Sequence, residues 1–92
     1  MHARALADFS GLTVNGTKIA APQVDDGRNL VIFFNVSDTT INFTYGVGGP
    51  NGNGGNCIPV AAGTGFSDDA PPNAAISLNC ASAGKAYTLW IN

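Results

Sequence analysis

The chain has 92 residues and little charge: four Lys or Arg side chains stand against six acidic ones, for a formal net charge of −2. This length suits one domain rather than two, and charged residues make up only 11% of it, against roughly 25% in an ordinary soluble domain. The sequence has no basic cluster that could neutralise a run of phosphates, which argues against nucleic acid as a partner. It also has no apolar stretch near the roughly 20 residues that span a bilayer, so no membrane partner is expected.

The first 27 residues hold short apolar pieces without a sustained period. Residues 12–14 and 17–19 flank Asn15 and Gly16, and Asn-Gly favours type I′ hairpin turns because both central residues of such a turn need a positive φ. We therefore predict a short β-hairpin here. It would belong to an extended N-terminal arm, residues 1–27, that precedes a compact body of residues 28–92.

Two strand-like segments open the body and meet at a polar corner. Residues 30–36 form a nearly continuous apolar run rich in β-branched and aromatic side chains, which is typical of a central strand covered on both faces. Residues 40–45 alternate instead, and such alternation indicates a strand with one wet face. The apolar set is Ile41, Phe43 and Tyr45, and the polar set is Thr40, Asn42 and Thr44.

A glycine-rich segment follows at residues 46–56, with six of the 12 glycines of the chain and no side chain that could build a core. Such a composition predicts a flexible surface loop. A phosphate-binding loop is the other interpretation, but Gly55 stands where that motif needs Lys, and no helical pattern follows to direct its amides at a phosphate.

The remaining strands are short. Residues 57–60 read as an edge strand because they include Pro59, residues 62–72 are rich in turn formers, and residues 75–80 and 86–91 are strand-like. No helical period is longer than one turn. These features predict an all-β fold, a small antiparallel β-sandwich of jelly-roll type.

Candidate chemistry is sparse. His2 is the single histidine, and a chain terminus does not hold a general base in fixed geometry, so we expect no catalytic residues and no enzyme. The pairs Asp25–Asp26 and Asp68–Asp69 lack the spaced oxygen ligands of a calcium loop. We interpret them as solvated turn residues and predict no metal and no cofactor.

Cys57 and Cys80 leave two alternatives. One disulfide between them would stabilise the fold by roughly 3 kcal/mol, but a reducing cytoplasm disfavours it. Cys80 continues the apolar alternation of Ile76 and Leu78, which favours a buried free thiol. Residues 1–8 lack the apolar core of a signal peptide, so synthesis in the cytoplasm is expected.

The aromatic residues Tyr45, Tyr87 and Trp90 also allow two interpretations. Aromatic faces can stack on sugars, and they also pack in cores and subunit interfaces. Packing is the interpretation that the sequence favours, and a sugar-stacking platform is the alternative.

Several segments resemble small head proteins of tailed bacteriophages, and together the similarity covers residues 28–92. The segments are residues 28–46, with Asn-Val-Ser-Asp at 35–38, then 57–63 (Cys-Ile-Pro-Val-Ala-Ala-Gly), 74–78 and 83–90 (Ala-Gly-Lys-Ala-Tyr-Thr-Leu-Trp). The glycine-rich loop and the two cysteines depart from that pattern. The resemblance implies a cement or decoration protein, often a homotrimer, with a β-sandwich or jelly-roll fold.

Such a protein binds the outside of the assembled head and clamps neighbouring subunits, so the implied partner is the major capsid protein. The implied location is the virion surface, after assembly in the host cytoplasm. The leading hypothesis is therefore a structural virion protein. The alternative is a receptor-binding or carbohydrate-binding tip domain of a phage tail or fibre protein.

Overall fold

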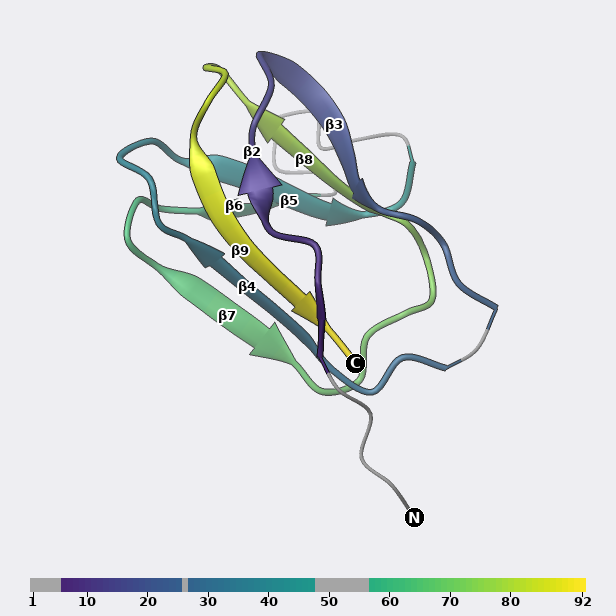
Figure 1. Ribbon diagram of the computed structural model, residues 1–92. Helices are drawn as coiled ribbons and strands as arrows, with labels where there is room; N and C mark the ends of the chain where they lie inside the picture. The colour runs from purple at the N-terminus through teal and green to yellow at the C-terminus, as the bar shows by residue number, and fades with distance from the viewer. Residues whose placement is uncertain (1–5, 26, 48–56) are drawn as a thin grey trace.

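The computed structural model describes residues 6–25, 27–47 and 57–92. In this part of the chain the secondary structure consists of nine strands, with no helix. The strands form two antiparallel sheets that lie face to face (Figure 1). The prediction of an all-β antiparallel sandwich is thereby confirmed.

The first sheet has the order β1-β9-β4-β7, and β2 pairs with β9 beside β1. Its strands are β1 (Ala7–Asp8), β2 (Gly11–Leu12), β4 (Val31–Asn35), β7 (Gly65–Asp68) and β9 (Ala86–Ile91). The second sheet has the order β3-β8-β5-β6. Its strands are β3 (Gly16–Ala21), β5 (Ile41–Tyr45), β6 (Ile58–Val60) and β8 (Ile76–Cys80).

The connections define a jelly roll. If β1 and β2 are counted as one interrupted strand, the chain crosses from one sheet to the other at every link except the one from β5 to β6. The first strand also pairs with the last, since β1 and β2 both lie against β9. Eight strands with this order in two sheets are the jelly-roll arrangement.

Aromatic side chains from both sheets fill the space between them. Phe33 of β4 lies 5.2 Å from Phe43 of β5, measured between ring centroids, and Phe43 lies 4.9 Å from Phe66 of β7. Phe33 and Phe43 have no exposed surface, and neither has Leu89 of β9. The core therefore depends on the inward-facing residues of each strand, as the period of two along a strand requires.

The prediction of an N-terminal hairpin and arm was wrong for the described residues. The strands on either side of Asn15 do not pair with each other, because β2 pairs with β9 in the first sheet and β3 pairs with β8 in the second. Gly16 has a φ of 107° at the point where the chain changes sheets. This segment is thus part of the sandwich, while residues 1–5 lie outside the described part.

Five strands were expected in the body, and each is present as β4, β5, β6, β8 or β9. The sequence did not predict β7, which lies within the turn-rich residues 62–72. Both cysteines are free thiols, with Cys80 buried and Cys57 half-buried, as the pattern around Cys80 favoured.

Candidate functional site

The outward face of the first sheet is unusually apolar. In one row of laterally paired residues, Trp90 lies beside Ile32, and Asp8 and Ser67 flank them. In the next row, Phe34 lies between Thr88 on one side and Gly65 on the other. In the row after that, Leu12 pairs with Ala86. Val36 continues the alternation past the end of β4. We call the apolar members the outer apolar face: Leu12, Ile32, Phe34, Val36, Ala86 and Trp90.

Four of these side chains are largely open to solvent: Leu12 is 56% exposed, Val36 53%, Trp90 42% and Phe34 41%. The solvated face of an antiparallel sheet normally carries polar residues. Here Asp8 is the one charged residue in the described rows. An exposed apolar surface of this kind is a candidate site for binding another molecule.

The structure corrects the prediction that residues 30–36 are covered on both faces. Val31 and Phe33 point into the core with no exposed surface, but Phe34 on the opposite side of β4 is open to solvent. Ile32 on the same side is half-buried. The second face of the strand is therefore covered only in part.

Trp90 lies beside Asp8 where β9 pairs with β1. Hydrogen bonds from Ser10, with a further one from the Trp90 side chain, lower the pKa of the Asp8 carboxyl below its ordinary value. The Asp8 carboxyl beside Trp90 is therefore held mainly by Ser10, whose backbone N–H donates to Asp8 Oδ1 at 2.9 Å.

Gly65 extends the outer apolar face to the edge of the sheet. A Cβ at this position would lie 2.7 Å from Cδ2 of Phe34 and would also clash with the Phe33 carbonyl oxygen. Only a residue without a side chain leaves room for the Phe34 ring over β7. The ring consequently covers the β7 backbone at Gly65.

The outward face of the second sheet is polar by comparison. Asn79 of β8 lies between Thr17 of β3 and Asn42 of β5, and its Nδ2 donates to Thr17 Oγ1 at 3.1 Å. Ser77, in the neighbouring row, is buried and donates its hydroxyl to the Gly46 carbonyl. Thr44 is buried as well, with 6% exposure, so the prediction of a wholly wet face on residues 40–45 was wrong at that position.

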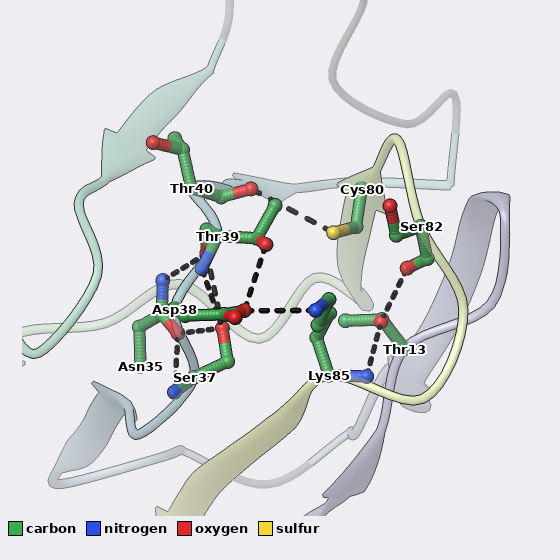
Figure 2. A network of polar contacts seen from close by, with 9 residues as sticks. All are labelled: Thr13, Asn35, Ser37, Asp38, Thr39, Thr40, Cys80, Ser82 and Lys85. Carbon is green, nitrogen blue, oxygen red and sulfur yellow. Dashed lines mark hydrogen bonds and ion pairs between the residues drawn. The ribbon is translucent and has the colours of Figure 1, made fainter.

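A dense polar network joins the two sheets at the corner between β4 and β5 (Figure 2). Nδ2 of Asn35 donates to the carbonyls of Thr39 and Val60, at 2.8 and 2.9 Å. Its Oδ1 accepts from the backbone N–H and the hydroxyl of Ser37, at 3.0 and 2.7 Å. All the hydrogen-bonding capacity of this buried amide is used within the corner, so Asn35 has a structural role.

The loop between β8 and β9 is tied to the same corner. Nζ of Lys85 lies 2.8 Å from Oδ1 of Asp38, and hydrogen bonds from Lys85 and Thr39 lower the pKa of Asp38. Thr13 Oγ1 donates to the Ser82 carbonyl and accepts from the Lys85 backbone N–H (Figure 2). These contacts hold loops together and include no nucleophile with an adjacent base.

The three aromatic residues of the sugar-stacking alternative do not lie together. Tyr87 faces the core with 3% exposure, and Trp90, three residues further along β9, faces solvent. The Tyr45 hydroxyl donates to Asp68 Oδ2 at 2.7 Å; burial and this bond raise the pKa of Tyr45. The three aromatic residues therefore do not form one surface.

The other sequence candidates stay separate. His2, Asp26 and most of the glycine-rich loop lie outside the described residues. Within the described ranges, no group of three His, Cys, Asp or Glu side chains could hold a metal ion, and no helix is long and apolar enough to cross a membrane. Comparisons with protein families, with curated proteins and with solved structures found no match to this chain.

The outer apolar face was not identified from the sequence, although one signal for it was present. The run at residues 30–36 is apolar at consecutive positions, which requires cover on both sides of the strand. A pattern of this kind does not say whether the chain itself or a partner provides the second cover.

Proposed function

We propose that this chain is a structural protein of a tailed-bacteriophage head, which binds the outside of the assembled shell and clamps neighbouring capsid subunits. The observation that carries the proposal is the outer apolar face, which would lie against the shell. The resemblance of residues 28–92 to small phage head proteins supplies the identity of the partner, the major capsid protein.

The character of the outer apolar face favours a protein partner. Aromatic and aliphatic side chains with few charges are typical of the buried centre of protein interfaces. Burial of Phe34 and Trp90 would contribute most of the binding energy, since large aromatic anchors dominate such interfaces. The polar residues Thr88, Ser67 and Asp8 lie within or beside the same rows.

The jelly-roll fold is compatible with two functions, because it occurs both in viral capsid domains and in lectins. Fold alone does not choose between them. A carbohydrate site needs several polar groups converging beside an aromatic ring. Beside Trp90 the paired neighbours are Ile32 and the already bonded Asp8, so protein binding is the function that we propose.

Binding to heads tests this proposal directly. The double variant Phe34→Ser/Trp90→Ser should weaken binding to heads assembled from the cognate major capsid protein by about 100-fold or more. Ile19→Ser is the matched control, because Ile19 is similarly exposed (48%) but lies on the other sheet. Equal binding by the wild type and the double variant would contradict the proposal.

Two further measurements separate the remaining alternatives. Saturable binding on a glycan array that Trp90→Ala abolishes would favour the tail-tip function instead. For the homotrimer that the resemblance implies, sedimentation velocity should give three times the 9.3 kDa mass of the chain.

A further inference from the structure

Asn15 and Gly16 form an Asn-Gly pair where the chain passes from the first sheet to the second. The pair lies between β2, which pairs with β9, and β3, which pairs with β8. Neither the core nor the outer apolar face uses the Asn15 side chain. Its chemistry is of a separate kind, because an asparagine amide reacts with the backbone nitrogen of the next residue, and asparagine counts among the thermolabile residues.

The side-chain amide of Asn15 is available for such a reaction. The residue is exposed, and within the described ranges its amide makes no hydrogen bond. Asn35, Asn73 and Asn79 differ, since each makes a side-chain hydrogen bond within the fold. A bonded amide keeps one orientation, whereas an unbonded one samples the staggered rotamers that bring Cγ close to the next backbone nitrogen.

Gly16 leaves the approach to its backbone nitrogen open. Its φ is 107°, in the region that favours glycine, and beyond its chain neighbours no atom lies within 4 Å of the place where a Cβ would stand. A larger residue would put a side chain beside the nitrogen. Two groups held next to each other in this way react far faster than the same groups free in solution.

The nitrogen of Gly16 lies at the very start of β3. Gly16 is opposite Cys80 in the first pair of the strand, and the pair of Thr17 with Asn79 follows. A terminal pair opens more readily than the pairs within a sheet. The reaction at Gly16 therefore needs one local opening and leaves the core packed.

We propose that Asn15 is a site of spontaneous deamidation. The backbone nitrogen of Gly16 gives its proton to a base in the solvent and attacks Cγ of Asn15. The new N–C bond closes a succinimide ring, while the bond from Cγ to the side-chain nitrogen breaks and that nitrogen leaves as ammonia. Water then opens the ring at one of its carbonyl carbons, so the balance is one water consumed and one ammonia released, without oxidant or reductant.

The ring opens to give one of two products. Cleavage of the bond between the Gly16 nitrogen and Cγ gives an ordinary aspartate at position 15. Cleavage of the bond between the nitrogen and the former backbone carbonyl carbon gives isoaspartate, in which the main chain runs through Cβ and Cγ and is one atom longer. Each product adds one negative charge to a chain whose net charge is −2.

The fold has little room for the extra main-chain atom of isoaspartate. Thr13 is fixed on one side, because its backbone N–H donates to the Lys85 carbonyl at 2.9 Å and its hydroxyl accepts from the Lys85 N–H at 3.0 Å. Gly16 is paired on the other side, so only Val14 and Asn15 lie between the two fixed points. We expect the isoaspartate form to lose the pairing of β2 with β9 and to unfold at a lower urea concentration.

Peptide mapping of the full chain tests the inference, which does not depend on the proposed function. Trypsin cleaves after Arg4 and Lys18, and residues 5–18 contain a single Asn and no Gln, so a mass gain in this peptide is unambiguous. The other Asn-Gly pairs, at residues 51–52 and 53–54, fall in a different peptide.

The wild type is incubated in warm, mildly alkaline buffer, once folded and once unfolded in guanidinium chloride. The folded sample should deamidate at Asn15 within about tenfold of the unfolded rate, because only a terminal pair has to open. Part of the product should be a substrate of an isoaspartyl methyltransferase. A folded sample that is still unmodified after more than ten half-times of the unfolded reaction would overturn the inference.

Two variants serve as controls. Asn15→Gln keeps the amide but needs a larger ring, so its peptide should stay unmodified over the same period. Asn15→Asp adds the charge without lengthening the main chain, and it should unfold at the wild-type urea concentration. If the purified isoaspartate form of the wild type unfolds at that concentration as well, the main chain absorbs the extra atom and the loss of β2 pairing is overturned.

Discussion

At the scale of single residues, Asn35 connects the two sheets. Its amide is fully buried and bonds to three other residues, Ser37, Thr39 and Val60. An alanine at this position would remove the side-chain donor to the Val60 carbonyl and one of two donors to the Thr39 carbonyl, and it would leave the Ser37 N–H without its acceptor. Each buried polar group that is left without a hydrogen-bond partner lowers the stability by about 1–3 kcal/mol.

We therefore expect Asn35→Ala to lower the free energy of unfolding by about 3 kcal/mol. Urea titration followed by circular dichroism measures this loss. Ser37→Ala is the matched control in the same corner, and it should cost about 1 kcal/mol because it removes only hydroxyl bonds. A loss for Asn35→Ala no larger than that of the control would show that the network contributes little.

At the scale of elements, the regular alternation of the later strands made them predictable. Leu89 and Ile91 alternate with Thr88 and Trp90 along β9, and the inward set is the buried one. The strand β7 was missed because its four residues, Gly-Phe-Ser-Asp, hold one large apolar side chain among turn formers. A strand that short depends on its pairing with β4, which no local pattern reveals.

The prediction of an N-terminal hairpin was wrong for a related reason. Asn15-Gly16 marks a sharp change of direction, and the sequence cannot say whether the strands on its two sides pair with each other or join different sheets. Likewise, the apolar run at residues 30–36 predicted two covered faces, but Phe34 on the second face is open to solvent. Both failures concern long-range partners, and the turn itself also differs from the prediction, because Asn15 lacks the positive φ that a type I′ turn needs.

Arg28 shows how the loops between elements are held. Its guanidinium donates to the carbonyls of Pro22, Pro72 and Ala74, and thereby joins the loop before β4 to the loop before β8. Burial lowers the pKa of Arg28. Only 9% of the surface of Arg28 is exposed, so water cannot replace these carbonyls as hydrogen-bond partners of the guanidinium.

Arg28→Lys should therefore be destabilising although it keeps the charge. One ammonium group cannot span three carbonyls as the planar guanidinium does, and we expect a loss of about 2 kcal/mol in the free energy of unfolding. Urea titration measures it, and Lys85→Arg, at a more exposed cation, is the control. If Arg28→Lys were as stable as the wild type, the hydrogen bonds from the guanidinium to the three carbonyls would not be needed for stability.

At the scale of the whole molecule, the N-terminal segment closes the first sheet. The backbone N–H of Phe9 donates to the Leu89 carbonyl at 2.7 Å, and Ser10 Oγ accepts from the Leu89 N–H at 2.9 Å. Phe9 also packs against the core. A 92-residue jelly roll buries a modest share of its surface, so the loss of one pair of short strands affects the entire fold.

Deletion of residues 1–12 removes β1 and β2 and leaves the edge of β9 open. We expect the free energy of unfolding to fall by about 3 kcal/mol and the protein to aggregate through the exposed strand. Thermal unfolding and light scattering measure the two effects. Deletion of residues 1–6 is the matched control, because it keeps both strands. If the longer deletion left stability and solubility unchanged, the segment would be a detachable arm after all, free to reach a neighbouring subunit instead of closing its own sheet.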